Sequence, residues 1–263
     1  MTTPTETPGQ VSGAVLLYRT PEPLSPEAHG GLAMKRTPNP YKFAVSAHAV
    51  PLQVTEFGPA AINYPIIFAG EERQPMAIMS IRQNENLFIN EEGFFVPDAY
   101  VPAFLRRYPF VLADDPDNRR MIVCIDTGAE QLVKDGDVPL FVDGKATEFT
   151  ESAIEFCTNF ETERQRTESF VQLAKELDLF ELKEATFTPA NPDGTPAAPI
   201  KLADYFTISE EKLKALSGDK LVELRNSGAL AQMYAQMTSL FCWDKLVART
   251  LVRDNPPQTG LLN

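Results

Sequence analysis

The chain has 263 residues, of which 43% are hydrophobic and 23% charged, the composition of an ordinary globular protein that can bury a sizeable core. Its 24 basic and 36 acidic side chains give a formal net charge of −12. This balance argues against a nucleic-acid partner and against adhesion to anionic lipids, because both need clustered Lys and Arg.

The amino terminus and the cysteines bear on the compartment of the protein. The opening MTTPTETPGQ has no basic segment followed by an apolar run, so no secretory signal is visible. Cys124, Cys157 and Cys242 lack paired spacing and lie in apolar surroundings typical of buried thiols. No stretch reaches the roughly 18 apolar residues of a spanning helix, so we expect no membrane insertion. We expect a cytoplasmic protein, which would need a non-classical route to reach the cell surface.

The first elements are extended segments broken by proline. Residues 1–12 are rich in Thr, Pro and Gly and are expected to form a flexible tail. A first strand is predicted at 14–18, ended by a proline-rich turn at 21–26, and a second extended piece at 41–45. Residues 55–63 have the pattern of a short helix with Thr55 as its cap and Pro59 in its first turn.

Short strands joined by polar loops follow. Strands are predicted at 66–69, 76–82, 87–90, 110–112 and 121–126, with a hairpin loop at 83–86, a short helix at 102–108 and a turn at 114–118. Sequential short strands with hairpin-length loops indicate an antiparallel sheet with helices packed on it. The predicted fold class is therefore α+β.

The composition changes near residue 148. Apolar residues recur every three or four positions over 150–182, which predicts one long amphipathic helix or two in sequence. A proline-rich loop at 188–199 precedes short helices capped by Ser209 and Asp219, and a last helix at about 229–252. We therefore expect an α+β sheet region at 13–147 and a helical region at 148–263, and leave open whether they form one continuous domain.

No motif of known chemistry stands out. The two histidines, His29 and His48, lack the close patterned neighbours that a metal site needs, and we expect no metal and no cofactor. Nucleophile elbows and phosphate-binding glycine loops are also missing from the sequence. Arg106 and Arg107 are candidates for an anion pocket, with His29 as a further candidate ligand-binding residue. The alternative is that these arginines flank buried strands and pair with carboxylates, which is the more common role of such side chains.

An apolar stripe lies near the carboxyl end, with Met233, Tyr234 and Met237 followed by Phe241 and Trp243. Such a stripe normally belongs to a core. If it is exposed, it is a candidate surface for a protein partner, because Met and aromatic side chains adapt to varied contacts.

Several stretches in fixed order resemble the SapC family of bacterial proteins, which are about this length. They are LSPEAH ending at His29, VPLQVTEFGPAAINYPIIFAG at 50–70, NLFIN at 86–90, YVPAFLRRYPF at 100–110, MIVCID at 121–126, and LSGDKLVELRNSGALAQMYAQMTSL within 208–246. The resemblance implies an association with a crystalline surface layer or with envelope-uptake gene clusters that contain TonB-dependent receptors, flavin-dependent halogenases and cupin-type hydroxylases. It brings no established catalytic residues.

Three hypotheses about function follow. The first is a non-enzymatic SapC-like protein that acts through contact with a protein partner of unknown identity in surface-layer or envelope-associated biology. The second is a small-molecule-binding protein or enzyme with a pocket between sheet and helical cover, using His29, Arg106 or Arg107. The third is an accessory subunit of a neighbouring halogenase or hydroxylase. The absence of catalytic motifs favours the first.

Overall fold

The computed structural model describes residues 16–115, 120–189, 195 and 197–255. Its contacts divide the chain into two compact units, which are described separately. Unit 1 contains residues 1–44, 91–94 and 104–162, and unit 2 contains residues 45–90, 95–103 and 163–263. This grouping differs from the predicted division near residue 148, which is a division along the sequence. The predicted flexible tail at 1–12 lies outside the described residues.

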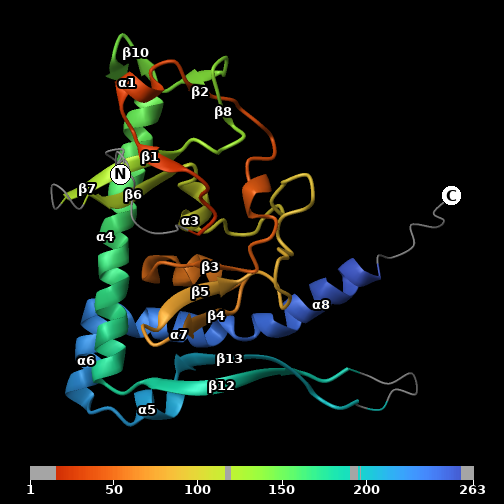
Figure 1. Cartoon of the computed structure of the whole chain (residues 1–263). Helices are drawn as coiled ribbons and strands as arrows, with labels where there is room; N and C mark the ends of the chain where they lie inside the picture. Colours follow the sequence, from red (N-terminus) through yellow and green to blue (C-terminus); the bar gives the residue numbers. More distant parts are fainter. Residues whose placement is uncertain (1–15, 116–119, 190–194, 196, 256–263) are drawn as a thin grey trace, which may run out of the picture. The chain divides into compact units, whose positions relative to one another are not determined.

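Unit 1 is built from short antiparallel strands (Figure 1). One three-stranded sheet has the order β1-β7-β6, a second has the order β8-β2-β9, and β10 pairs with β11. The strands are β1 (Pro21–Pro23), β2 (Ala33–Met34), β6 (Phe110–Asp115), β7 (Arg120–Asp126), β8 (Leu132–Val133), β9 (Val138–Pro139), β10 (Phe141–Val142) and β11 (Lys145–Ala146).

Short helices and part of one long helix complete unit 1. These elements are α1 (Pro26–His29), η1 (Lys42–Ala44), the last three residues of α3 (Ala103–Arg106), and residues 148–162 of α4 (Glu148–Glu176). The core of unit 1 packs Phe110 and Ile125 from neighbouring strands against Leu140, Phe141 and Cys157. The predicted pairing of strands near 110–112 and 121–126 is confirmed, since β6 and β7 form an antiparallel ladder.

The strand predicted at 14–18 is not found in its described part. Residues 14 and 15 lie outside the described residues, residues 16–18 are not in a strand, and the segment that pairs with β7 is the proline-containing Pro21–Pro23. Proline is tolerated there because β1 lies at the edge of its sheet, where a missing N–H leaves no ladder bond unmade. The buried carboxylate of Asp126 accepts the backbone N–H of Arg19 (3.0 Å) and of Thr20 (2.8 Å), which positions the chain just before β1.

Residues 41–45 are also not extended. Lys42–Ala44 form the 3₁₀ turn η1, closed by the N–H of Ala44 donating to the carbonyl of Tyr41 at 2.9 Å. The turn places the ring of Phe43 on that of Tyr108, with 3.8 Å between ring centroids and 16° between planes. A 3₁₀ turn with a stacked aromatic pair therefore stands where the sequence predicted an extended segment.

Unit 2 contains a five-stranded antiparallel sheet of order β12-β13-β4-β5-β3. The strands are β3 (Ala49–Pro51), β4 (Ile66–Ala69), β5 (Gln74–Ile78), β12 (Phe180–Phe187) and β13 (Ile200–Ile208). The helices are η2 (Val54–Glu56), α2 (Phe57–Ala60), residues 163–176 of α4, α5 (Glu210–Lys214), α6 (Gly218–Ser227), α7 (Ala229–Ser239) and α8 (Cys242–Asp254). Antiparallel sheets with short helices and a helical carboxyl-terminal region confirm the α+β class.

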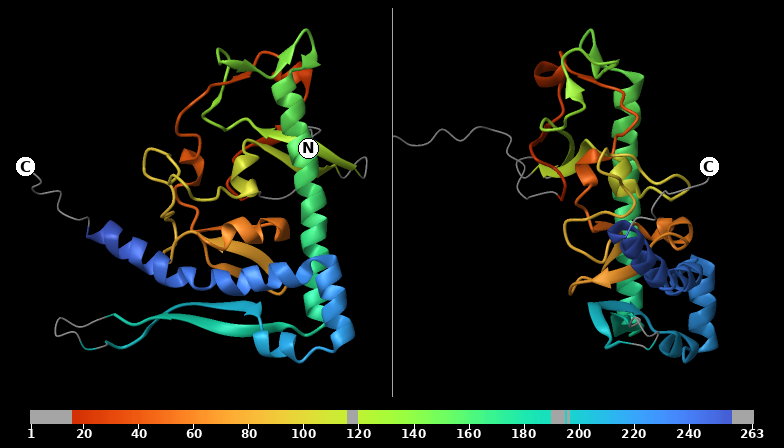
Figure 2. Two further views of the ribbon diagram at one scale, coloured as in Figure 1. Left: turned by 180° about the vertical axis from the view of Figure 1, so that it is seen from behind. Right: turned by 90° about the vertical axis from the view of Figure 1, so that its right-hand side faces the viewer.

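The hairpin of β12 and β13 was not predicted. Figure 2 shows this long two-stranded ribbon from two sides. The predicted helix over 150–182 ends at Glu176, because Asp178 adopts the left-handed conformation (φ 50°) and the N–H of Leu179 donates back to the carbonyl of Ala174 at 2.9 Å. The loop predicted at 188–199 lies between the two strands and is partly outside the described residues.

Three further predictions in unit 2 need correction. No strand forms at 87–90, where Ile89 makes a single bridge with Phe95. The last helix is divided into α7 and α8 by turns in which the N–H groups of Leu240 and Phe241 donate to carbonyls three residues earlier. Helix α6 is capped by the side chain of Ser217, not by Asp219. The predicted helix cap Ser209 is the residue before α5.

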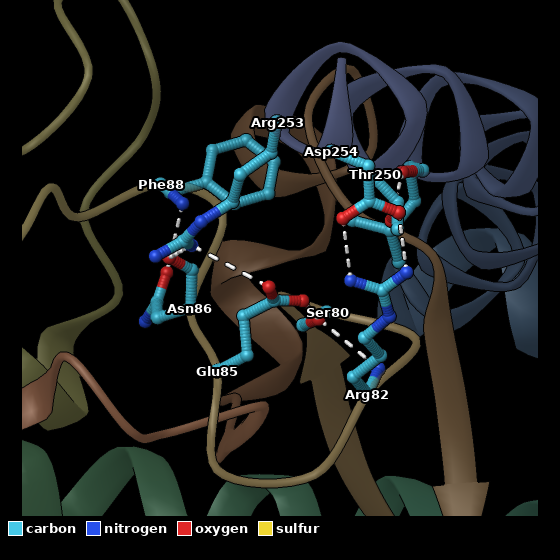
Figure 3. A network of polar contacts seen from close by, with 9 residues as sticks. Ser80, Arg82, Glu85, Asn86, Phe88, Thr250, Arg253 and Asp254 are labelled. Carbon is cyan, nitrogen blue, oxygen red and sulfur yellow. Dashed lines mark hydrogen bonds and ion pairs between the residues drawn. The ribbon is translucent and has the colours of Figure 1, made fainter. Parts of the chain in front are cut away.

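The end of α8 is fixed to the loop after β5 by charged side chains (Figure 3). Arg82 binds both carboxylate oxygens of Asp254, at 2.7 and 2.5 Å. Arg253 donates to the carbonyl of Asn86 at 3.1 Å and lies 3.7 Å from the carboxylate of Glu85. Among the described residues, no helix is both long and apolar enough to cross a membrane.

Candidate functional site

His29, one of the predicted ligand-binding residues, is the last residue of α1 in unit 1 and is only 1% exposed. Its Nδ1 lies 3.3 Å from both the backbone N and the carbonyl oxygen of Ser25. Its buried Nε2 has no hydrogen-bond partner within the part of the chain that the structure describes. The local turn therefore holds this imidazole through one nitrogen.

Arg106 and Arg107, the other two predicted residues, lie at the end of α3 in unit 1. The guanidinium carbon of Arg107 lies 4.3 Å from the ring centroid of Phe160, 4.6 Å from that of Phe104 and 5.7 Å from that of Tyr18. Arg106 lies 5.3 Å from the ring centroid of Phe156. Both cations are thus placed on aromatic faces, Arg106 as an exposed side chain and Arg107 as a half-buried one, and for Arg107 this arrangement stabilises a partly buried charge.

The cysteine thiols are poorly suited to nucleophilic chemistry. Cys124, Cys157 and Cys242 are buried, and burial raises the pKa of the Cys124 and Cys157 thiols to about 11. Burial also raises the pKa of Cys242. Because the thiolate is the reactive form, these groups are protonated and inert near neutral pH. The described residues include no group of three or more His, Cys, Asp or Glu side chains that could hold a metal ion.

The three predicted partner-surface residues lie on α7 in unit 2 and differ in exposure. Met233 is fully buried, Met237 is half-buried and Tyr234 is 44% exposed. Phe241, which stands between α7 and α8, is 78% exposed and is the most exposed large hydrophobic side chain among the described residues. The outer part of the predicted stripe therefore meets solvent, whereas Met233 belongs to the core.

Unit 2 also contains a pocket of about 400 Å³ between the sheet and the second half of α4. It is lined by Pro51, Leu52, Gln53, Glu72, Arg73, Gln74, Pro75, Arg164, Thr167, Glu168, Val171, Gln172 and Lys175. Its volume is within the range of small-molecule sites. It has the predicted location between sheet and helical cover, but His29, Arg106 and Arg107 do not line it.

Two buried polar side chains form one wall of this pocket. Gln53 and Thr167 are each 5% exposed, and Thr167 Oγ1 lies 2.9 Å from Gln53 Oε1. Thr167 Oγ1 also accepts the N–H of Val54 at 2.9 Å and lies 2.7 Å from the carbonyl oxygen of Glu163. The hydroxyl is therefore fully used within the protein. The Gln53 side chain also accepts the backbone N–H of Glu56 in a capping box. Among the described residues no hydrogen bond from Gln53 Nε2 is found, which leaves this donor for a ligand.

Charged side chains form the rest of the pocket wall. Arg73 donates to the carbonyl of Gly70 at 2.5 Å, and its guanidinium carbon lies 3.4 Å from the ring centroid of Phe206. Arg164 forms an ion pair with Glu168, one helical turn later. Lys175 lies 3.4 Å from the carboxylate of Glu72, whose side chain is 92% exposed. These contacts hold three cations around the opening and leave the guanidinium of Arg73 without a carboxylate partner among the described residues.

The residues that line this pocket were not among the predicted site residues. Its residues come from β3, the β4–β5 turn and α4, and no local motif joins these segments. The available signal was Gln53 within the apolar stretch VPLQV and Thr167 at a position of the predicted apolar helix face, since buried polar residues are the informative exception in a core.

The comparisons with known proteins give one match. The family model described as SapC matches residues 24–246. No curated protein and no solved structure matches the chain. The resemblance read from the sequence is confirmed by this match, which covers most of the 263 residues. The chain therefore belongs to the SapC family.

Proposed function

We propose that this protein acts by binding another protein in bacterial surface-layer or envelope-associated biology. The binding surface is formed by Tyr234 and Met237, the exposed part of the predicted stripe on α7, and by Phe241 at the α7–α8 junction. The observation that carries the proposal is the 78% exposure of Phe241. Full burial of a large aromatic side chain that is exposed to water lowers the free energy by roughly 1.5–3 kcal/mol. Such side chains are enriched at the centres of protein interfaces.

The surroundings of Phe241 support an extended contact. Leu230, Tyr234, Met237 and Phe241 follow one another at intervals of four, three and four residues, and all four are at least partly exposed. At this spacing Leu230, Tyr234 and Met237 lie along one side of α7, and Phe241 follows in the turn between α7 and α8. Ile62, which is 67% exposed, lies beside the start of α8, where its carbonyl oxygen is 3.2 Å from Lys245 Nζ.

This surface defines the chemistry of the partner that it fits. The partner is a protein with an apolar hollow that receives Phe241 and a carboxylate placed opposite Lys245. Aromatic and methionine side chains supply adaptable contact area. The partner carries out its role at the cell envelope, and the SapC protein is made in the cytoplasm and reaches the envelope by a non-classical route or through the partner.

Affinity purification from the native bacterium, combined with cell fractionation, tests the proposal. The wild-type chain and the Leu182→Ser variant are expected to recover the same partner in equal amount. The Phe241→Ser variant is expected to lose it, while keeping the circular dichroism and melting temperature of a folded chain. Leu182 is a matched control, because it is 62% exposed and lies on β12, outside the stripe. Equal recovery with Phe241→Ser would refute the proposal.

A second candidate function is binding of a small molecule in the pocket between the sheet and α4. The observation in its favour is the 400 Å³ volume together with the unused donor of Gln53. A small probe that binds the wild-type chain would support this function if Gln172→Trp abolishes its binding and Gln83→Trp preserves it. Both glutamines are exposed. Gln172 lines the pocket, and Gln83 lies in the loop after β5 and does not.

A further inference from the structure

The charges around the unit 2 pocket are opposite in sign to the charge of the whole chain. The lining contains three cations, Arg73, Arg164 and Lys175, and two carboxylates, Glu72 and Glu168, which leaves a net charge of +1. The whole chain has a formal charge of −12. At short range the three cations of the lining favour an anionic ligand over a cationic one.

Arg73 carries the excess charge. Its Nη1 donates to the carbonyl of Gly70 at 2.5 Å and lies 3.3 Å from the carbonyl of Glu71, which fixes the plane of the guanidinium group. The rings of Phe206 and Phe180 lie on its face, with centroids 3.4 and 5.9 Å from Cζ. These contacts leave its other N–H groups for an acceptor. A guanidinium group offers a planar fork that matches a carboxylate.

The remaining lining separates into a polar and an apolar part. Gln53 Nε2 is a second donor, held in place by the contact between Gln53 Oε1 and Thr167. Leu52 and Val171 are 2% and 6% exposed and, with Pro51 and Pro75, present apolar surface. A ligand that satisfies both parts has one acceptor group and an apolar body.

We propose that this pocket binds a small monocarboxylate with an apolar body, the carboxylate facing Arg73 and Gln53 Nε2 and the body facing Leu52 and Val171. A single negative charge matches the single excess positive charge of the lining. The inference rests on the second candidate function, binding of a small molecule in this pocket, and adds the ligand class.

Three probes of equal size separate the ligand class from the existence of the site. Phenylacetate, phenylacetamide and phenethylamine carry the same ring and differ in charge. Their affinities for the full-length chain are measured by ligand-observed NMR and calorimetry. Phenylacetate is expected to bind about tenfold more tightly than phenylacetamide, because a charge-assisted hydrogen bond replaces a neutral one. Phenethylamine is expected to bind most weakly.

Variants assign the binding to the pocket. Arg73→Gln is expected to reduce the affinity for phenylacetate to that for phenylacetamide, whereas Lys220→Gln, which removes an exposed cation on α6, is expected to change neither. Gln172→Trp fills the pocket and is expected to abolish binding of every probe, and Gln83→Trp is expected to preserve it. Thermal melts show that each variant is folded.

The outcomes distinguish the two claims. If phenylacetamide or phenethylamine binds as tightly as phenylacetate, or if Arg73→Gln leaves the preference for phenylacetate unchanged, the carboxylate ligand class is wrong. The small-molecule function survives that result as long as Gln172→Trp abolishes the binding. If no probe binds, or if Gln172→Trp leaves binding intact, both the ligand class and the small-molecule function are overturned.

Discussion

Gln236 on helix α7 and Ile66 on strand β4 are joined by a buried hydrogen bond, in which Gln236 Nε2 donates to the carbonyl of Ile66 at 2.8 Å. The same carboxamide accepts the N–H of Ile208 on β13 at 3.1 Å through Oε1. Strands β4 and β13 share only the residue pair Phe206 and Phe68 in their ladder. The Gln236 side chain of α7 therefore binds two backbone groups, one on β4 and one on β13, that the one-pair ladder between these strands leaves without a partner.

Replacing Gln236 by Met is expected to lower the free energy of unfolding by about 2–4 kcal/mol. The substitution keeps the length of the side chain but leaves the Ile66 carbonyl and the Ile208 N–H buried without a partner. Urea unfolding measures the loss. Gln232→Met on the same helix is the control and is expected to be nearly neutral, because Gln232 Oε1 already lacks a partner among the described residues. Equal losses in both variants would contradict the bridging role.

The aromatic environment of Arg107 is expected to contribute to stability. Arg107→Ala removes a cation from three ring faces and should lower the free energy of unfolding by roughly 1–3 kcal/mol. Arg106→Ala removes a cation from the face of Phe156 and should have a smaller effect. Thermal and urea unfolding of the two variants check this order. A larger loss for Arg106→Ala would show that the rings around Arg107 do not stabilise its charge.

The buried thiols predict a loss of stability at alkaline pH. Burial raises the pKa of Cys124 and Cys157 to about 11 in the folded chain, whereas unfolded thiols titrate near 8.5–9. Below about pH 8 both states keep the proton and the full stability is present. Between about pH 9 and 11 the unfolded state loses the proton first, so stability falls as the pH rises.

Urea unfolding at several pH values measures this dependence. The double variant Cys124→Ala, Cys157→Ala is expected to be less stable at pH 7.5, because it loses buried side chains, but to show a shallower decline between pH 9 and 11. Identical slopes for the variant and the wild type would show that other groups are responsible for the decline.

Gly93 is expected to resist substitution. Its φ is +94°, and a Cβ at this position would lie 2.7 Å from Lys42 Cβ and 2.8 Å from the Lys42 backbone N. Gly93→Ala should lower the free energy of unfolding by roughly 2 kcal/mol or more, because both the left-handed backbone and the overlap are unfavourable. Gly31→Ala, where a Cβ meets nothing within 4 Å, is the matched control and should have little effect. Urea denaturation compares the two.

The parts of the fold that were predicted from the sequence have local signals. Strand β4 lies between Pro65 and Gly70, which fix its start and end, and α5 directly follows its predicted cap, Ser209. Strands β12 and β13 lack such signals. The apolar residues Leu177 and Leu182 continue the helical spacing of α4, and the left-handed turn at Asp178 that ends the helix occurs at a non-glycine residue.

The candidate sites also divide into residues with a local sequence signal and residues without one. Phe241 and Tyr234 were included in a stripe defined by helical spacing, and the spacing could not say that Met233 faces the core while Phe241 faces solvent. The pocket depends on the contact of Gln53 with Thr167, which are 114 positions apart. Such a contact is set by tertiary packing, so no window of the sequence contains it.

Site-specific photo-crosslinking in the native cells tests most directly the proposal that the chain acts through a protein partner bound at Phe241. A photoreactive phenylalanine analogue is incorporated at position 241 in one strain and at position 182 in another. One defined crosslinked partner is expected from position 241 and none from position 182. Absence of a crosslink at position 241, or the same products from both positions, would contradict the proposal.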